Sequence, residues 1–200
     1  MAWLIDKIIW IELNSFFYRP LVMKKAIFLV LFAVQACEAQ QDTADQTMEK
    51  ECEISFEKFD QCSFQAPSYE ISAKVIAEDV AEDEKLISSV IIKNNSIEQT
   101  LPITEGTSML DGDIGYISFS DINFDNIPDL AVPTSFGTPN LYLDYWVFDE
   151  QQKKYIFVGN YPQLSIDKAK QIITTRVKES AANYNVTEWH WKEGALESKE

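Results

Sequence analysis

Short stretches of alternating hydrophobic and polar residues fill most of the chain after residue 68. Tyr69, Ile71, Ala73, Val75 and Ala77 alternate with mostly polar neighbours, the period-two pattern of a strand with one buried face. Residues 86–93 and 97–101 flank the turn residues 94–96 (Asn-Asn-Ser) and predict a hairpin. The same pattern predicts strands at Tyr116–Ser120, Leu130–Val132, Leu141–Phe148, Tyr155–Val158, Gln171–Lys178, Tyr184–Trp191 and Ala195–Glu197.

The spacing of these segments indicates the fold class. Strands that recur roughly every 8 to 14 residues are typical of an all-β sandwich, barrel or propeller fragment. No segment has the pattern of a long amphipathic helix, although Ser165–Lys170 fits a helical turn. Leu141–Phe148 is apolar on both faces, so we expect a central strand whose aromatic residues pack in the core rather than forming a platform for sugars.

A charged segment followed by an apolar one, near the N-terminus, is typical of an export signal. Met23 precedes Lys24 and Lys25, and residues 26–34 are uninterruptedly apolar. This run is shorter than the roughly 20 residues that span a bilayer. We therefore expect a signal peptide at 23–36, with residues 1–22 as an upstream extension and Met23 as the true start. Alternatively, residues 2–22 form a first amphipathic or membrane helix.

The end of this signal, residues 34–37 (Val-Gln-Ala-Cys), resembles the lipobox of bacterial lipoproteins, although Gln35 replaces the usual small residue. Cys37 is therefore the predicted lipidation site, which would anchor the protein to the membrane in the periplasm. The alternative is ordinary cleavage, before Cys37 or after Ala39, which would give a secreted protein. Residues 37–51 are mostly polar and read as a flexible tether, followed by a folded domain at 52–200.

Two further cysteines, Cys52 and Cys62, follow the predicted cleavage point. In an oxidising compartment such a pair usually forms a disulfide, here around nine intervening residues. The alternative is a pair of reduced, buried thiols.

The charge of the chain restricts its partners. It has 17 Lys and Arg against 32 Asp and Glu, a net charge of −15. From Cys37 onward the counts are 13 and 30, so the mature part would carry −17. This charge makes nucleic-acid binding improbable and leaves cationic partners and metal ions open. His190 is the only histidine, and no serine or cysteine motif accompanies it, so we identify no catalytic residue and expect a binding protein rather than an enzyme.

One loop, residues 121–130, carries most of the candidate chemistry, and we call it the aspartate loop. Oxygen side chains occupy its positions 1, 3, 5 and 9 (Asp121, Asn123, Asp125 and Asp129), and the Ile127 carbonyl would complete position 7. Hard cations such as Ca²⁺ bind six to eight oxygen ligands, so these five residues are the predicted calcium ligands. The loop is not an EF-hand, because its flanks read as strands. The alternative is a metal-free turn held by its own Asp and Asn side chains.

Three segments together resemble a known family: residues 121–132 (Asp-Ile-Asn-Phe-Asp-Asn-Ile-Pro-Asp-Leu-Ala-Val), 140–149 (Asn-Leu-Tyr-Leu-Asp-Tyr-Trp-Val-Phe-Asp) and 154–157 (Lys-Tyr-Ile-Phe). They are similar to bacterial periplasmic lipoproteins with a partial β-propeller-like domain, whose members include immunity proteins against lysozyme-like peptidoglycan hydrolases. The aspartate loop is also similar to the calcium loops of FG-GAP propeller blades, except that Asn123 and Asn126 replace the usual Asp and Gly. The resemblance covers roughly residues 116–197 and implies an all-β, partial β-propeller-like fold.

The resemblance and the charge together suggest a lipid-anchored inhibitor of a cationic, lysozyme-like hydrolase, because opposite charge accelerates association. Candidate inhibitory connections are 110–115 and 135–140, expected at the strand ends beside the aspartate loop. The alternative is a calcium-dependent structural or adhesion module at the cell surface. A hydrolase ranks last, because a glycosidase needs two carboxylates about 5 to 9.5 Å apart across a sugar cleft, and one crowded loop supports this poorly.

Overall fold

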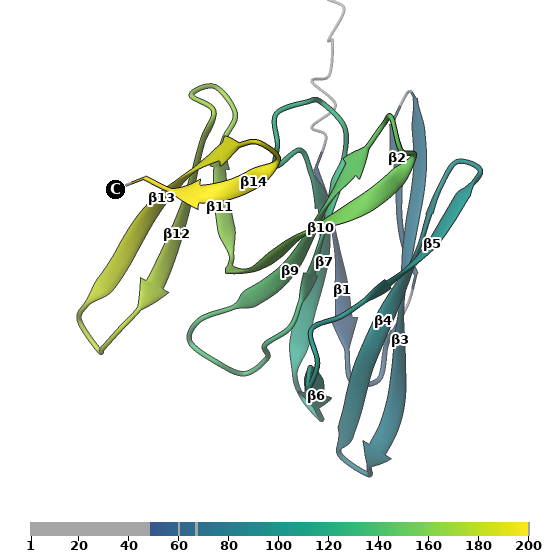
Figure 1. Cartoon of the computed structure of the whole chain (residues 1–200). Helices are drawn as coiled ribbons and strands as arrows, with labels where there is room; N and C mark the ends of the chain where they lie inside the picture. The colour runs from purple at the N-terminus through teal and green to yellow at the C-terminus, as the bar shows by residue number, and fades with distance from the viewer. Residues whose placement is uncertain (1–48, 60, 67, 200) are drawn as a thin grey trace, which may run out of the picture. The chain divides into compact units, whose positions relative to one another are not determined.

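A computed structural model describes residues 49–59, 61–66 and 68–199 (Figure 1). The upstream extension 1–22, the signal peptide 23–36, Cys37 and the tether as far as residue 48 lie outside the described residues. Within the described part, the chain forms fourteen strands and no helix, which confirms the all-β prediction. Accordingly, no described segment is a helix that is long and apolar enough to cross a bilayer.

The strands form three antiparallel sheets, each open at both edges (Figure 1). Sheet A has the order β1-β7-β8-β9-β10, with β1 (Lys50–Ser55), β7 (Ile114–Ser120), β8 (Asp129–Pro133), β9 (Tyr142–Asp149) and β10 (Lys154–Pro162). Sheet B has the order β2-β3-β4-β5, with β2 (Cys62–Ala66), β3 (Tyr69–Ala81), β4 (Glu84–Asn94) and β5 (Ile97–Pro102); β6 (Ser108–Leu110) also pairs with β4. Sheet C has the order β11-β12-β13-β14, with β11 (Leu164–Asp167), β12 (Ile172–Lys178), β13 (Tyr184–Lys192) and β14 (Ala195–Ser198).

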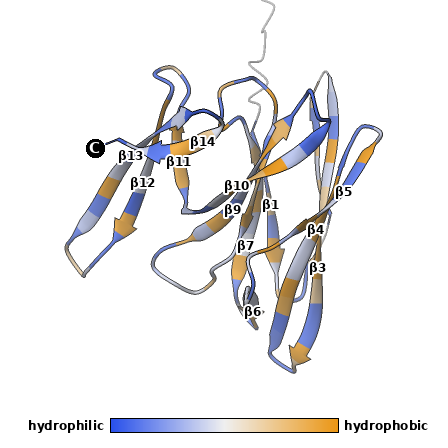
Figure 2. Ribbon diagram, in the orientation of Figure 1, coloured by the Kyte–Doolittle hydropathy of each residue, from blue (hydrophilic) through white to orange (hydrophobic). Residues whose placement is uncertain are grey.

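Every strand predicted from the alternating pattern is present, with ends that differ by a few residues. The clearest case is β3, whose buried residues Ile71, Ala73 and Val75 alternate with more exposed neighbours. Alternating hydrophobic and polar positions are visible along β3 and β4 in Figure 2. The helical turn predicted at Ser165–Lys170 is wrong, because residues 164–167 form β11 and a turn follows. The first residues of β11 pair with Thr175 and Thr174 of β12, and this strand pairing outweighs the helical pattern.

Sheet A is buried on both faces, as the two-sided apolar pattern of residues 141–148 predicts. On one face, Trp146 and Phe148 pack with residues of sheet B in the larger hydrophobic cluster. On the other face, Leu143 and Tyr145 form a second cluster with partly buried residues of sheet C, among them Trp191. Because a strand's side chains alternate between its faces, β9 contributes to both cores, and so do its neighbours β8 and β10.

The predicted disulfide is present between Cys52 in β1 and Cys62 in β2, with a Cα–Cα distance of 5.5 Å. It joins sheet A to sheet B next to the larger cluster, where Cys62 is fully buried. The folded part begins earlier than predicted, because β1 starts at Lys50, which pairs with Phe119 of β7. Lys50 and Glu51, assigned from sequence to the tether, therefore belong to the sheet.

Candidate functional site

The aspartate loop connects β7 to β8 in sheet A. Both strands are fixed by pairing, since Ser118, Phe119 and Ser120 face Ala131, Leu130 and Asp129. Asp121 and Asp129, at the two ends of the loop, are 4% and 1% exposed. Asp125, in the middle, is exposed. The sequence-predicted ligands therefore lie on one short connection but in very different environments.

The carboxylates of Asp121 and Asp125 accept hydrogen bonds from the loop's own backbone. Asp121 accepts the N–H groups of Asp125 at 3.1 Å and Asn126 at 2.9 Å. Asp125 accepts the N–H of Ile127 at 2.8 Å and the Asn123 side-chain amide at 2.9 Å. This is the Asx-turn chemistry of a loop closed by its acidic side chains.

Asp129 joins the loop to the neighbouring strand. One carboxylate oxygen accepts the N–H of Ile122 at 2.9 Å, and the other accepts the N–H of Phe148 in β9 at 2.9 Å. The backbone pairing between β8 and β9 extends from Pro133 to Leu130, and Leu130 pairs with Trp146. Asp129 is the next residue of β8, just beyond the end of this pairing. Its side chain thus replaces the next backbone partner of β9.

Two residues of the loop have positive φ angles: Phe124 and Asn126, both at 64°. Asn126 stands where such loops usually have glycine, and asparagine tolerates the left-handed conformation better than most residues. The loop is also held from sheet C, because the Trp191 indole donates a hydrogen bond to the Ile122 carbonyl at 2.5 Å. That contact explains why a strand far along the chain restrains this loop.

Burial and neighbouring charges raise the carboxyl pKa values here. The pKa of Asp129 lies well above its ordinary value, chiefly because burial disfavours the charged form, and hydrogen bonds from Phe148 and Ile122 oppose this only in part. The pKa of Asp125 is also raised, first by burial and then by the charges of Asp121 and Glu150. The loop thus concentrates negative charge that a cation would relieve.

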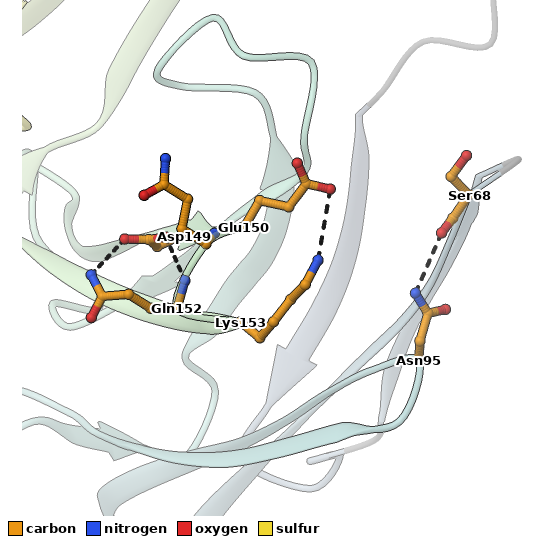
Figure 3. Close-up of polar contacts among 7 residues, drawn as sticks. Ser68, Asn95, Asp149, Glu150, Gln152 and Lys153 are labelled. Carbon is orange, nitrogen blue, oxygen red and sulfur yellow. Dashed lines mark hydrogen bonds and ion pairs between the residues drawn. The ribbon is translucent and has the colours of Figure 1, made fainter.

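Glu150 belongs to the tight turn between β9 and β10, shown in Figure 3. Asp149 holds this turn by accepting the N–H groups of Gln151 and Gln152, both at 2.8 Å. Among the described residues, the Glu150 carboxylate makes a long ion pair with Lys153, at 3.9 Å, and no other ion pair. Its charge therefore remains available to act on Asp125. The same view shows Asn95, in the β4–β5 turn, bonded to the Ser68 carbonyl.

The described residues do not bring three or more His, Cys, Asp or Glu side chains together as a metal site does. The aspartate loop is instead closed by the hydrogen bonds above. Calcium binding by Asp121, Asn123, Asp125, Ile127 and Asp129 therefore stays a prediction. In the loop, backbone N–H groups donate hydrogen bonds to the same carboxylate oxygens that would bind a cation.

The two candidate inhibitory connections lie together, but not beside the aspartate loop. Residues 110–115 lead into the start of β7 and residues 135–140 follow the end of β8, whereas the aspartate loop joins the opposite ends of these strands. The expected proximity to the aspartate loop is therefore wrong, because an antiparallel hairpin has its single connection at one end only. Phe136 packs directly on Gly115: a Cβ on Gly115 would lie 2.5 Å from the Phe136 ring.

These connections, together with Thr134 immediately before the second one, form what we call the loop pair, residues 110–115 and 134–140. Leu110 is 50% exposed and Ile114 54% exposed. Asn140 anchors the second connection to β12, accepting the N–H of Lys178 at 2.7 Å and donating to its carbonyl at 3.1 Å. The result is a defined surface with two exposed aliphatic side chains.

His190 is exposed on β13, while Trp189 and Trp191 on the other face are half-buried. The Trp189 indole donates to the Thr175 hydroxyl at 2.9 Å. These tryptophans therefore help to fix sheet C.

Sequence reasoning missed a buried carboxylate, Asp144, which is fully enclosed in β9. Its oxygens accept the N–H and hydroxyl of Thr104 at 2.7 and 2.6 Å, and the Asn160 side chain at 2.8 Å. The sequence feature that could have identified Asp144 is its place as a charged residue within the otherwise apolar run 141–148, on the face that carries Trp146. Such a residue needs buried partners, but periodicity does not say which ones.

No family model, curated protein or solved structure matches the chain. The resemblance to periplasmic lipoproteins therefore rests on the motifs quoted above.

Proposed function

We propose that the chain is an exported, lipid-anchored binding protein of the periplasm that inhibits a cationic, lysozyme-like peptidoglycan hydrolase. The signal-like segment 23–36 and the lipobox-like Cys37 support the location. The motifs shared with periplasmic immunity proteins support the kind of target. In this proposal the protein acts by occupying its partner, and no catalytic residue is assigned to it.

The loop pair is the observation that carries the proposal. An inhibitor needs a surface with a few apolar anchors on a fixed backbone. Leu110 and Ile114 are exposed to about half of their surface. The contact of Phe136 with Gly115 and the Asn140 bonds to Lys178 restrain the backbone around them. We infer that these two side chains contact the hydrolase.

Charge supports the choice of a basic target. The chain contains 17 Lys and Arg against 32 Asp and Glu, a net charge of −15. Opposite net charges accelerate association by one or more orders of magnitude at low salt. Inhibition of a basic hydrolase is therefore expected to develop more slowly as ionic strength rises.

The decisive experiment measures lysis of cell-wall suspensions by a panel of lysozymes and lytic transglycosylases, with and without the purified protein. Ile114→Asp is expected to weaken inhibition at least tenfold, because it places a charge in the buried part of the interface. Val80→Asp is the matched control, since Val80 is also 54% exposed and lies on the β3 strand of sheet B. Equal inhibition by both variants would show that the hydrolase does not bind at the loop pair. Absence of inhibition across the panel would reject the function.

We also propose that the fold is partial β-propeller-like. A propeller blade is a four-stranded antiparallel meander. Three such meanders follow one another in the chain: β2 to β5, β7 to β10 and β11 to β14. Adjacent meanders share hydrophobic clusters, as blades do. An experimental structure with sheets related by successive rotation about a common axis is the expected result.

The second candidate is a calcium-dependent structural or adhesion module. It is favoured by the curled backbone at Phe124 and Asn126 and by the raised pKa of Asp125 beside Asp121. Calcium at 100 times its dissociation constant would raise the free energy of unfolding by about 2.7 kcal/mol. Asp125→Asn is expected to remove most of that gain. Thermal unfolding in Ca²⁺ and in chelator tests this, and identical curves would exclude calcium binding.

A further inference from the structure

A groove opens between the edge strands of two sheets, β5 of sheet B and β10 of sheet A, and we call it the edge groove. It has a volume of about 340 Å³. Its walls are mostly hydrophobic and include Leu101, Ile103, Trp146, Tyr155 and Phe157. This volume lies at the low end for ligand sites, so the groove fits one large side chain with its adjoining backbone rather than a folded element.

Residues 99–104 form one wall of the groove. Hydrogen bonds join each end of this segment to sheet A, which forms the other wall. At one end, the Gln99 amide accepts the Tyr155 N–H at 2.8 Å and donates to the Tyr155 carbonyl at 3.0 Å. At the other, Thr104 donates to the buried carboxylate of Asp144 through its N–H and its hydroxyl. These bridges fix the spacing of the walls, so the groove is built into the fold.

Trp146 contributes an indole N–H group that differs from those of the tryptophans in sheet C. Trp189 and Trp191 donate their indole N–H groups to Thr175 and to the Ile122 carbonyl. By contrast, no residue in the described ranges accepts a hydrogen bond from Trp146 Nε1. In the same part of the chain, every fully buried side-chain nitrogen or oxygen has a partner. Because Trp146 Nε1 has no such partner, it is not fully buried and belongs to the 1% of the Trp146 surface that is exposed. Trp146 is one of the residues that line the groove.

Phe157 forms an accessible wall beside this donor. It is 52% exposed, and its ring lies 5.5 Å from the Trp146 ring in a tilted arrangement. The β-bulge between Phe157 and Gly159 interrupts the pairing of β10 with β9 at this point. Bulges commonly re-aim a side chain. The large apolar side chain of Phe157 is therefore exposed to solvent at the border of the groove.

We propose that the edge groove binds one large apolar side chain on an extended segment of a positively charged partner protein. A main-chain carbonyl of that segment accepts the Trp146 Nε1–H, which has no acceptor within the described part of the chain. The net charge of −15 on the chain selects a basic segment. A second copy of this chain is disfavoured by the same charge.

The partner's identity rests on the proposed function, but the groove's chemistry does not. The Asn160 side chain connects the two surfaces, because it donates to Asp144 at the end of the groove and to the Thr134 hydroxyl at the start of the second connection of the loop pair, both at 2.8 Å. A hydrolase held by the loop pair would therefore have a second contact close by.

The test uses the purified full chain with its disulfide formed and follows tryptophan indole N–H resonances by NMR. Trp146→Phe assigns the Trp146 resonance. The probe is the tripeptide Ac-Lys-Phe-Lys-amide, with Ac-Lys-Ala-Lys-amide and Ac-Glu-Phe-Glu-amide for comparison. The Phe-containing basic peptide is expected to shift the Trp146 resonance saturably and to leave Trp189 and Trp191 unchanged. The alanine and acidic peptides are expected to bind several-fold more weakly.

Phe157→Ala is expected to weaken binding of the basic peptide about three- to tenfold, as for loss of one aromatic contact. Tyr184→Ala is the matched control, an aromatic residue 46% exposed on β13. An unmoved Trp146 resonance, or equal affinity for all three peptides, would overturn the proposal.

An inhibition assay with Phe157→Ala separates the two proposals. If the peptide shifts Trp146 but the wild-type protein inhibits no hydrolase, the groove stands and the proposed function fails. If wild type and Phe157→Ala inhibit a hydrolase equally and the peptide leaves Trp146 unmoved, the function stands and the groove proposal fails.

Discussion

The side-chain amide of Gln99 bonds both backbone groups of Tyr155, accepting its N–H at 2.8 Å and donating to its carbonyl at 3.0 Å. Tyr155 lies in β10, the edge strand of sheet A, and Gln99 lies in β5, the edge strand of sheet B. The amide therefore takes the place that a neighbouring strand would occupy. It also keeps this point of the edge from pairing with another chain.

Gln99→Ala removes both hydrogen bonds and leaves the Tyr155 backbone groups without their partner. We expect a loss of about 1–3 kcal/mol in the free energy of unfolding, measured by urea denaturation, together with more self-association in sedimentation at high concentration. Gln65→Ala is the control, because Gln65 is exposed in β2. Equal stability of the two variants would show that the amide bridge contributes nothing.

Gly115 is required by the close approach of Phe136. A Cβ at position 115 would lie 2.5 Å from the Phe136 ring and 2.9 Å from Pro133. Gly115→Ala is therefore expected to cost about 1–3 kcal/mol, the usual penalty of overpacking, and to displace the loop pair. In the Phe136→Ala background the same substitution is expected to cost less, because the nearest clash is gone. A double-mutant cycle in urea measures the difference, and strict additivity would refute the contact.

The disulfide between Cys52 and Cys62 closes a short loop between sheets A and B. The loss of loop entropy in the unfolded chain predicts a stabilisation of about 2–3 kcal/mol. The double variant Cys52→Ser, Cys62→Ser is expected to unfold at correspondingly lower urea concentration. The wild-type protein under reducing conditions is the comparison, and its midpoint should approach that of the double variant. A midpoint unchanged in both would mean that the bridge adds no stability.

Local periodicity predicts strands with an apolar face, including short ones such as β8 and β14, but not strands that are mostly polar or that also fit a helical pattern. The β3 and β4 strands alternate clearly, and β9 is apolar on both faces, so each was recognisable. In β1 (Lys-Glu-Cys-Glu-Ile-Ser) only Ile54 is buried, because β1 is an edge strand, and its charged residues resemble a tether. The β11 strand has four residues and is fixed only by β12.

The same limit applies to the candidate site. Spacing identified the aspartate loop, and Asn126, at the usual glycine position, has the left-handed backbone that glycine adopts readily. Spacing does not reveal that Asp129 bonds Phe148, 19 residues away, or that Trp191 donates to Ile122, 69 residues away. The edge groove depends on Gln99 meeting Tyr155, a contact that needs the packing of two sheets. These pairings follow from tertiary structure, which a single sequence does not encode in its local pattern.

Asp129 gives stability a pH dependence of defined sign. Its pKa is raised in the folded protein, mainly by burial, so the folded state binds a proton more tightly than the unfolded state does. Its contribution to stability is complete below the unfolded pKa, about 3.9, and is lost as the pH rises through the raised folded value. Asp129→Asn cannot titrate and retains only one acceptor for the N–H groups of Ile122 and Phe148, so it is expected to cost about 1–3 kcal/mol at pH 4.5. That cost should shrink toward pH 8. Urea unfolding of both proteins in chelator, at several pH values, measures it; a cost that grows with pH would mean that Asp129 favours its ionised form in the fold.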